Sequence, residues 1–404
     1  MTSGRAGAWP LAVLLASLSM LGPFSIDVYL PAFHDIGRDL DVAPLAVQQT
    51  LSSFLFAYAF MMLWHGALSD ALGRRPVVLV GLGVYAVATL GCAIAGNIET
   101  LWLFRALQGV CAGIGMVVGR AIVRDKFQGH EAQRVMSQIT LVFAIAPALA
   151  PILGGVLLNA FGWRSIFWVL FGLVVIIFMC AARSLPETLP VAQRQSLHPR
   201  ELWKSYVEVL RNREFLLLAT IPALNFAAFF LYIASAPSFL IDRLGVSTYG
   251  FAWLFIPMIG GVMIGALISG RAAGRLSATR AIALGYALMF VGATLQMAAA
   301  WYADPIVFLH VLPIMIYTMG SAIAAPSATL LLLDLFPTKR GMASSLQGFV
   351  HFVLAAVNAG TISPFLAHSL KGLAAGMAGF TLLSVALWAV YRRRRLAMVR
   401  IQTS

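Results

Sequence analysis

Residues 164–182 read Arg-Ser-Ile-Phe-Trp-Val-Leu-Phe-Gly-Leu-Val-Val-Ile-Ile-Phe-Met-Cys-Ala-Ala, an apolar run that decides the class of this fold. A helix needs about 20 mostly apolar residues to cross the hydrocarbon core of a bilayer, and this run has that length. Similar runs recur along the whole chain, so we predict twelve membrane-spanning helices. The runs lie near residues 9–31, 45–68, 77–96, 100–121, 135–158, 164–182, 215–240, 250–269, 281–301, 306–333, 342–366 and 373–391.

The composition agrees with a chain whose solvent is lipid. Of 404 residues, 60% are hydrophobic and 11% are charged, whereas a soluble domain is about half apolar and a quarter charged. We therefore predict an all-α polytopic membrane protein. Cys92, Cys111 and Cys180 all fall inside apolar runs, and we expect free buried thiols without a disulfide framework.

The net charge of +13 is distributed unevenly. With the N-terminus in the cytoplasm, 23 of the 28 lysines and arginines fall on the cytoplasmic side, and Arg105 alone lies within a span. This asymmetry follows the positive-inside rule and predicts that both termini are cytoplasmic. The basic run at 392–395 is then an anchor at the lipid headgroups, so we expect the lipid bilayer as a partner and no nucleic acid.

One polar stretch, at 184–213, divides the chain into six apolar runs on each side. We predict an N-terminal six-helix bundle at 1–183, a cytoplasmic linker at 184–213 and a C-terminal six-helix bundle at 214–404. Within the linker, apolar residues recur at helical spacing and predict an amphipathic helix on the membrane surface. These residues are Leu202, Trp203, Tyr206, Val209 and Leu210. A duplicated architecture suits a transporter whose binding site lies between the halves.

Several short segments resemble motifs of the major facilitator superfamily (MFS). They are Ile26-Asp-Val-Tyr-Leu-Pro31, Gly66-Ala-Leu-Ser-Asp-Ala-Leu-Gly-Arg-Arg-Pro76, Leu101-Trp-Leu-Phe-Arg-Ala-Leu-Gln-Gly109, Ala146-Pro-Ala-Leu-Ala-Pro-Ile-Leu-Gly-Gly155 and Leu185-Pro-Glu-Thr188. Together they are similar to the bicyclomycin/chloramphenicol-resistance (Bcr/CflA) branch of twelve-helix drug–proton antiporters. The loop motif at 66–76 is common to many facilitators, whereas the helix 4 and helix 5 segments together are more specific for export by antiport.

The resemblance implies the twelve-helix MFS fold and proton-coupled efflux of small amphiphilic drug-like molecules by alternating access. It also implies a monomer in the bacterial cytoplasmic (inner) membrane that is driven by the proton gradient without a cofactor. One departure is Ser19, because some relatives carry a second carboxylate at this point of helix 1. That difference argues against multi-proton coupling and against a strong preference for cationic drugs.

Asp27 and Arg105 are the only well-embedded charges among the first six spans. An ionised group at membrane depth costs about 3 kcal/mol even on a lenient scale, so such groups are rarely idle. Counted from the predicted span ends, both lie roughly 6–9 Å below the outer boundary, which allows them to face each other. Burial favours the neutral carboxyl and an arginine favours the carboxylate, so a change in their separation changes proton binding. We predict a proton-coupling pair; a static ion pair between helices 1 and 4 is the alternative.

The loop motif supplies a predicted conformational latch made of Gly66, Asp70, Gly73, Arg74 and Arg75. Its glycines allow a tight turn and close approach of the backbone. By resemblance, Asp70 would reach the N-terminus of a helix from the other half and stabilise the outward-facing state through the helix dipole. The alternative is that the two arginines only follow the positive-inside rule.

The helix 5 motif is the predicted antiporter hinge and comprises Pro147, Ala150, Pro151, Gly154 and Gly155. Each proline removes one helix hydrogen bond, and the paired glycines let a neighbouring helix pack closely. Ordinary packing of small residues explains the same pattern, and the resemblance favours the functional interpretation.

Aromatic residues and one amide in helices 2 and 7 suit a cavity for flat, mostly apolar ligands. The predicted substrate-binding residues are Phe54, Tyr58, Asn225, Phe226, Phe229 and Tyr232. For any single aromatic residue, packing or lipid contact is the competing interpretation.

The remaining polar residues receive simpler interpretations. His310 and His351 lie inside spans, and histidines can titrate near neutrality. Because nothing in the sequence places a charge beside them, we expect neutral, hydrogen-bonded packing residues, and a part in proton coupling is the alternative. The carboxylates interpreted as solvated loop charges are Asp35, Asp39, Asp41 and Glu187. The sequence shows no nucleotide-binding loop, metal-ligand cluster or nucleophile–base pair, so we expect neither an enzyme, nor an ATP-driven pump, nor a metal site.

Two other functions remain open at this point. Export of a natural metabolite such as a sugar, an amino acid or a siderophore fits the same features, and substrate screening in vesicles separates it from drug efflux. A transporter-like sensor is the third possibility, although the 30-residue linker is short for a soluble output domain.

Overall fold

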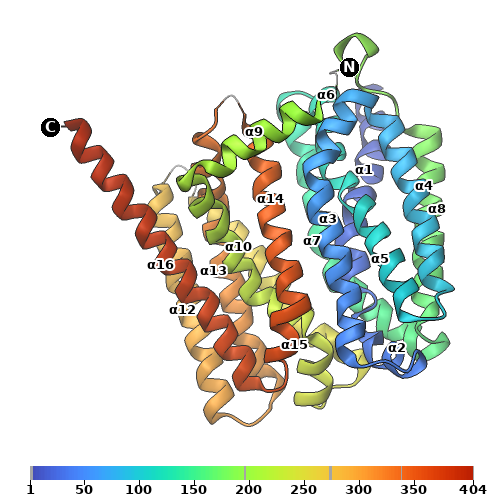
Figure 1. Cartoon of the computed structure of the whole chain (residues 1–404), viewed down its shortest axis with the longest axis vertical. Coiled ribbons are helices and arrows are strands. Elements are labelled where there is room, and N and C mark those ends of the chain that lie inside the picture. Colours follow the sequence, from blue (N-terminus) through green and yellow to red (C-terminus); the bar gives the residue numbers. More distant parts are fainter. Residues whose placement is uncertain (1–2, 195–196, 273–274, 338, 404) are drawn as a thin grey trace. The chain divides into compact units, whose positions relative to one another are not determined.

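The computed structural model describes residues 3–194, 197–272, 275–337 and 339–403, and the regular elements within these ranges are all helical (Figure 1). Within the same ranges, eleven helical segments are long and apolar enough to cross a membrane, and a further apolar segment, Ile145–Phe161, lies in α7. Each of these segments overlaps one of the twelve predicted spans. The expected all-α polytopic fold is thereby confirmed.

The helices gather into two compact units, and each is described by itself. Unit 1 comprises Met1–His198 with Thr248–Ala252, and unit 2 comprises Pro199–Ser247 with Trp253–Ser404. The elements of unit 1 are α1 (Ser3–Asp27), η1 (Leu30–Ala32), α2 (Phe33–Asp39), α3 (Pro44–Leu72), α4 (Arg74–Ala93), α5 (Ile98–Ala112), α6 (Ile114–Lys126), α7 (Gly129–Phe161), α8 (Arg164–Ser184), η2 (Val191–Gln193) and η4 (Thr248–Phe251). Those of unit 2 are α9 (Pro199–Arg211), α10 (Arg213–Ala234), η3 (Pro237–Arg243), α11 (Ala252–Ala272), α12 (Ala278–Tyr302), α13 (Val307–Asp334), α14 (Arg340–Val357), η5 (Asn358–Ile362), α15 (Ser363–Leu366) and α16 (Leu370–Thr403).

Helix α8 shows why this chain needs lipid around it. One side of α8 packs against α4 and α1, whereas Trp168 and Ile176 are 48% and 56% exposed. Large apolar side chains exposed in this way are stable when lipid covers them. Cys180 lies on the exposed part of α8, so the expectation of three buried thiols is wrong for this residue, whereas Cys92 and Cys111 are buried.

The first predicted span, 9–31, is not one continuous helix. Helix α1 ends at Asp27, and the chain continues through η1 and α2. Pro31 has no backbone N–H, so it cannot extend the hydrogen-bond ladder of α1. As a result, the predicted coupling carboxylate lies at the end of a helix rather than in its middle.

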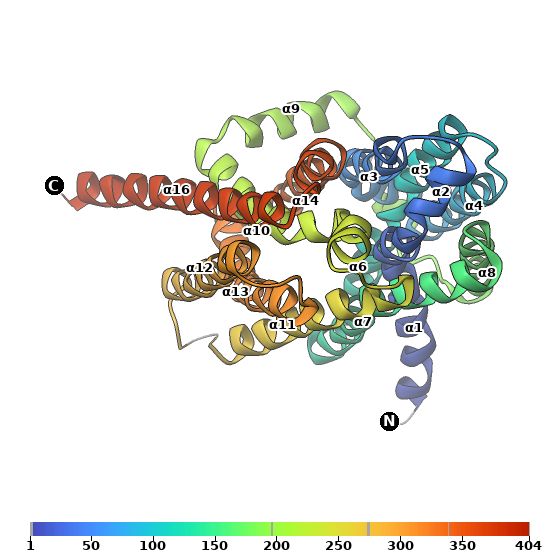
Figure 2. The same ribbon diagram turned by 90° about the horizontal axis from the view of Figure 1, so that it is seen from below.

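In unit 2, α12 and α13 lie side by side (Figure 2), and glycines line their contact. Gly285 of α12 lies against Gly320 of α13, and Gly292 lies against Pro313 and Tyr317. A Cβ on Gly292 would come within 2.8 Å of the Pro313 carbonyl oxygen, so the two helices approach this closely only because glycine has no side chain. These contacts fix the antiparallel register of the pair.

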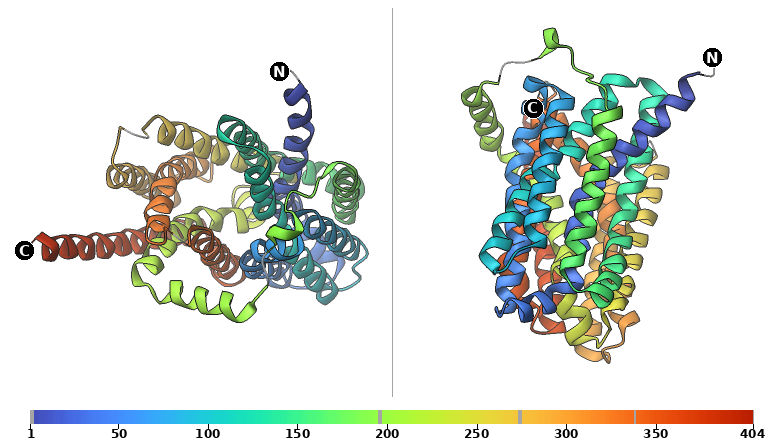
Figure 3. Two further views of the ribbon diagram at one scale, coloured as in Figure 1. Left: turned by 90° about the horizontal axis from the view of Figure 1, so that it is seen from above. Right: turned by 90° about the vertical axis from the view of Figure 1, so that its right-hand side faces the viewer.

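The predicted amphipathic helix is confirmed as α9, which runs crosswise to α10 and α14 within unit 2 (Figure 3). Tyr206 and Val209 are buried, whereas Trp203 on the other side is 62% exposed. The Lys339 ammonium donates to Glu208 Oε2 at 2.6 Å and ties α9 to the start of α14. The position of α9 on a membrane surface remains a prediction.

Candidate functional site

The end of helix α1, at Asp27, lies directly against α7. Asp27 is the last residue of α1 and is only 4% exposed. Gly154 of α7 packs on the backbone carbonyl of Val28, and the approach leaves no room for a side chain. Gly155 is also close to backbone, because an added Cβ would lie 2.6 Å from the carbonyl oxygen of Thr248. The predicted hinge motif therefore touches the residue that follows the predicted coupling carboxylate.

Arg105 of α5 is fully buried in the same unit. Its guanidinium carbon lies 4.2 Å from the ring centroid of Tyr29 and 4.5 Å from that of Phe54. Arg105 Nη1 donates to Gln108 Oε1 at 2.8 Å, and Gln108 Nε2 donates to Thr89 Oγ1 at 2.8 Å. Aromatic faces attract a cation, so the rings and the amide hold the guanidinium without a carboxylate.

The structure buries both members of the predicted coupling pair without joining them. Nε and Nη2 of Arg105 have no hydrogen-bond partner among the described residues, and Nη1 binds Gln108. The static ion pair considered as an alternative is therefore not the arrangement seen here. A buried guanidinium with two unpaired nitrogens, which carry three N–H groups, is costly, and these donors suit a carboxylate that comes within reach.

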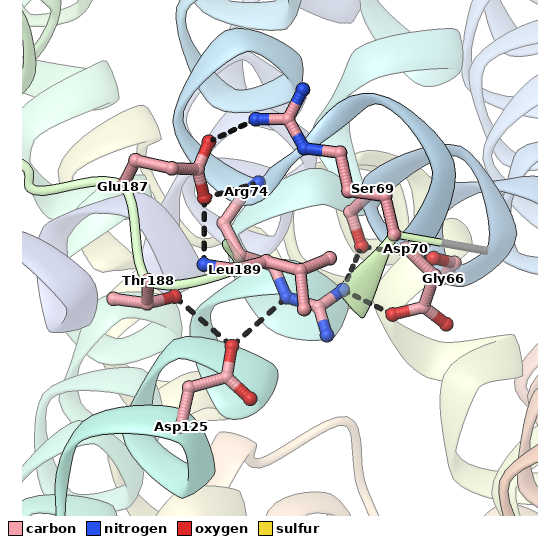
Figure 4. Close-up of polar contacts among 9 residues, drawn as sticks. Gly66, Ser69, Asp70, Arg74, Asp125, Glu187, Thr188 and Leu189 are labelled. Carbon is pink, nitrogen blue, oxygen red and sulfur yellow. Dashed lines mark hydrogen bonds and ion pairs between the residues drawn. The ribbon is translucent and has the colours of Figure 1, made fainter. Parts of the chain in front are cut away.

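A second charged cluster, the Arg74 network, surrounds the turn between α3 and α4 (Figure 4). Gly73 has a φ of 101°, a conformation that favours glycine. Arg74 Nη1 donates to Asp70 Oδ1 at 2.5 Å and to Ser69 Oγ at 2.6 Å. Arg74 Nε donates to Asp125 Oδ2 at 3.1 Å, at the end of α6. The Arg74 side chain is 8% exposed, so the positive-inside rule alone does not account for it.

The segment after α8 joins the Arg74 network. Glu187 Oε1 accepts hydrogen bonds from the backbone N–H groups of Arg74 at 3.0 Å and Leu189 at 2.9 Å. The Thr188 hydroxyl donates to Asp125 Oδ2 at 3.0 Å. A carboxylate at the first N–H of α4 is favoured by the helix dipole. The interpretation of Glu187 as a solvated loop charge is wrong, because this side chain is 28% exposed and binds the start of a helix.

Two other carboxylates were also misjudged as loop charges. Asp35 and Asp39 lie in α2. Asp39 Oδ2 accepts from Arg164 Nη1 at 2.5 Å and from Trp163 Nε1 at 3.1 Å, whereas Asp35 pairs with Arg38. Helix α2 has only seven residues. So short a segment shows little helical periodicity, and it follows directly after the long first span.

Asp125 and Gln108 were not predicted as site residues from the sequence. In both cases a feature of the sequence indicates the interaction that the structure shows. Asp125 is a lone acid between Arg124 and Lys126 at the end of the fourth span. Gln108 is three residues after Arg105, a spacing at which side chains meet on one face of a helix.

The predicted substrate residues fall into a buried group and a partly exposed group. Buried side chains are Phe54, Tyr58, Asn225 and Tyr232. Phe226 and Phe229 of α10 are partly exposed, and the ring centroids of Phe226 and His351 are 4.1 Å apart. Their role in binding a substrate remains a prediction.

His310 differs from the expectation of a hydrogen-bonded packing residue. Its side chain is fully buried, and neither ring nitrogen has a hydrogen-bond partner among the described residues. The lack of hydrogen-bond partners could not be predicted from the sequence, because one sequence does not show which side chains of other helices lie next to this histidine.

The two arginines of the loop motif offer a matched comparison. We expect Arg74→Gln to lower the free energy of unfolding by about 1–3 kcal/mol, because the half-buried Asp125 loses a charged partner. Arg75→Gln should cost less, since within the described part of the chain the one hydrogen bond of the Arg75 side chain runs from Nη2 to the Ala182 carbonyl oxygen, at 2.8 Å. Thermal unfolding of both variants in detergent measures the difference. An equal or larger cost for Arg75→Gln would contradict the structural role of Arg74.

Comparison with known proteins adds to this geometry. The sequence profile of the Major Facilitator Superfamily matches residues 15–359. The chain is 32% identical over 351 residues to the uncharacterized MFS-type transporter YdgK of Bacillus subtilis, covering 86% of this chain and 87% of that protein. It is 28% identical to the bicyclomycin resistance protein homolog of Haemophilus influenzae, over 85% of this chain and 86% of the relative. It is also 28% identical to multidrug resistance protein D of Escherichia coli, over 84% of each chain.

Solved structures agree on the fold. The nucleoside transporter NupG matches with a TM-score of 0.75 at 14% identity, over 96% of this chain and 99% of that one. A D-xylose–proton symporter matches with a TM-score of 0.73 at 14% identity, over 94% and 97% of the two chains. At such low identity these similarities concern the fold alone.

Proposed function

Because the chain belongs to the Major Facilitator Superfamily, we propose that it exports small amphiphilic drug-like molecules in exchange for protons. Two relatives that cover 85% and 84% of the chain are named for bicyclomycin resistance and multidrug resistance. The segments that resemble drug–proton antiporters all lie in unit 1, which also contains Asp27 and Arg105. The proposal involves a single chain as the working unit and the proton gradient as its energy source.

The observation that carries this proposal is the separation of the two buried charged groups. Arg105 keeps two unpaired nitrogens while the rings of Tyr29 and Phe54 hold it in place. Asp27 is the last residue of α1, so the proposal requires movement of this helix end and not bending of a continuous helix. When this end moves relative to α5, the distance from the carboxyl group to the guanidinium changes, and the balance between carboxylic acid and carboxylate changes with it.

Alternating access turns this balance into proton coupling. In the outward-facing state Asp27 takes up a proton from the acidic outer side and Arg105 remains with Gln108. In the inward-facing state Arg105 favours the carboxylate, so the proton leaves to the cytoplasm. The proton thus favours one conformational state and the drug favours the other. Because the two binding events are linked in this way, binding of the drug releases the proton.

We assign the Arg74 network to the control of these states. It ties the ends of α3 and α6 to the start of α4 and to the segment after α8 through one buried arginine. All these contacts depend on Arg74, so they should form together and break together. Such all-or-none behaviour suits a latch with two states.

The orientation is part of the proposal and has its own test. Reporters fused after Ser404 and within the 190–200 segment should both read cytoplasmic, because 23 of the 28 basic residues lie on that side. A reporter inserted between Ala303 and Pro305 should read external. Alkaline phosphatase and fluorescent protein fusions measure these positions. A C-terminus on the external side would contradict the orientation.

Arg105→Lys should reduce efflux although the positive charge remains. A lysine ammonium cannot donate to Gln108 and keep two further donor nitrogens in the fixed plane of a guanidinium. A charged hydrogen bond contributes about 1.5–3 kcal/mol, so we expect a loss of about tenfold to a hundredfold in efflux rate. Initial efflux rates in proteoliposomes measure it. Arg124→Lys, in the exposed end of α6, is the matched control and should leave the rate unchanged.

Drug-triggered proton release tests the proposed function directly. Purified protein in weakly buffered detergent solution, with a soluble pH indicator, should release protons when a neutral drug such as chloramphenicol is added. A panel of sugars and amino acids serves as the comparison set. Proton release only with a metabolite would replace drug efflux by metabolite export, and no release with any compound would reject proton-coupled antiport.

A further inference from the structure

Three polar side chains are enclosed near one end of unit 2. They are Tyr232 of α10, Gln296 of α12 and His310 of α13, and each has an exposed fraction of 0%. Five of their polar atoms have no hydrogen-bond partner among the described residues: the Tyr232 hydroxyl, both atoms of the Gln296 amide and both ring nitrogens of His310. Buried polar groups are nearly always paired, so five unpaired atoms in one place call for an explanation.

The helix register places these groups together. Gly292 of α12 lies against Pro313 and Tyr317 of α13. Gln296 is one helical turn beyond Gly292, and His310 is one turn before Pro313, so both are displaced by about 5 Å toward the same end. The Tyr232 hydroxyl approaches Gln296 without hydrogen-bond geometry. We call Tyr232, Gln296 and His310 the outer polar cluster.

Other buried polar side chains of unit 2 have at least one hydrogen bond each: Asn225 and Asn358 leave Oδ1 unpaired but donate through Nδ2 to the Tyr286 hydroxyl and to the Ala227 carbonyl oxygen. The Tyr286 hydroxyl pairs with Ser384 at 2.6 Å, and the Thr381 hydroxyl donates to Tyr317 at 3.2 Å. Unit 2 therefore can satisfy polar side chains in its interior with protein groups. The outer polar cluster departs from that pattern and offers donors and acceptors for something other than protein.

We propose that Tyr232, Gln296 and His310 form a water-binding site that takes up a proton from the outer side, with His310 as the proton acceptor. Water bridges the five polar atoms, since a hydroxyl, an amide and an imidazole each donate and accept hydrogen bonds. The outer location rests on the orientation proposed above, in which the α12–α13 connection is external. The titration of His310 does not depend on drug export or on Asp27.

The surroundings of His310 explain why water is required. Among the described elements packed on α13, the titratable groups are few at this level: Tyr232 comes from α10, and Asp304 lies in the α12–α13 connection. The Asp304 backbone carbonyl approaches the imidazole without hydrogen-bond geometry, and the Asp304 residue is exposed. His351 of α14 stacks on Phe226 instead, and α11 carries no titratable group before Arg271. No carboxylate of the described residues forms an ion pair with His310, so an imidazolium here depends on water and neutral dipoles for its stabilisation.

Such a site gives unit 2 its own response to external acidity. Histidine is the side chain that changes charge between about pH 5 and pH 8. Protonation requires hydration, and hydration favours separation of the outer ends of α10, α12 and α13. External protons would therefore favour the open outer end independently of the coupling carboxylate in unit 1.

Nuclear magnetic resonance of the full-length protein tests the proton uptake. With all seven histidines labelled with ¹⁵N in the imidazole ring, the resonance that disappears in His310→Gln belongs to His310. We expect that resonance to change from the neutral to the imidazolium pattern as the pH is lowered. In Gln296→Leu the midpoint should fall by at least one pH unit. A His310 resonance that stays neutral at pH 5 in folded protein overturns the proposal.

Hydroxyl-radical labelling by X-ray radiolysis tests the water. Labelling of a buried side chain reports bound water beside it, and Tyr317 provides a matched control because it is equally buried but hydrogen-bonded to Thr381. Tyr232 should be labelled at least threefold faster than Tyr317, and Gln296→Leu should remove the difference. Equal labelling of the two tyrosines overturns the water-binding site. Drug-triggered proton release measured in His310→Gln reports on the proposed function separately, since it depends on Asp27.

Discussion

Replacing Asp27 with asparagine is expected to reduce efflux driven by a pH gradient to the rate of liposomes without protein. The amide is similar in size to the carboxyl group but cannot bind and release a proton during the cycle. Drug transport is therefore no longer coupled to the proton gradient. A neutral drug should still bind, because the apolar contacts of a cavity do not depend on this proton. Proton release on drug binding should disappear in the same variant. Counterflow and pH-indicator measurements in proteoliposomes and detergent give the two readouts.

The matched control for this variant is Asp35→Asn. Asp35 also lies close after α1, but it is paired with Arg38 at the surface, so its neutralisation should leave coupling unchanged. The coupling role would be refuted if Asp27→Asn protein still concentrated drug against a gradient with its pH dependence intact. His310 would then be the next candidate, because it is the buried histidine of the outer polar cluster.

The membrane fold could be predicted from residue types alone, and the reason is physical. A bilayer-spanning helix must bond all its backbone groups internally and cover them with about 20 apolar residues. That requirement is local, so a run such as 164–182 reveals its structure without its neighbours. The interruption after Asp27 was harder to predict, because Pro31 is compatible both with a helix end and with the last turn of a continuing helix.

The chemistry of the site was only partly predictable. Asp27 and Arg105 were visible because a charge in an apolar run stands out. Their separation was not visible, since it depends on Tyr29 and Phe54 holding the guanidinium from two other elements. The partners of Arg74 were hidden for the same reason: Asp125 is 51 residues from it in sequence.

The contact between Gly154 and the chain after Asp27 leads to the second large expected effect. Gly154→Ala should nearly abolish transport, because the new Cβ would overlap the backbone carbonyl of Val28. A backbone carbonyl cannot rotate aside as a side chain does, so either α7 or the end of α1 must shift. Overpacking of this kind costs about 1–3 kcal/mol, which a folded bundle tolerates. The shift would move Asp27, the adjacent residue, relative to Arg105.

The controls for this variant follow from the other glycines. Gly172→Ala in α8 meets no atom within 4 Å, so this variant should transport normally and show that an added methyl group is harmless elsewhere. Unfolding temperature and drug binding separate a coupling defect from a folding defect in Gly154→Ala. If the hinge motif acts through the break after Asp27, the variant retains the fold and binds drug, but the pH dependence of its drug-triggered proton release changes. Normal transport by Gly154→Ala would show instead that the close contact at Val28 relaxes without consequence, and that the α7 motif serves packing alone.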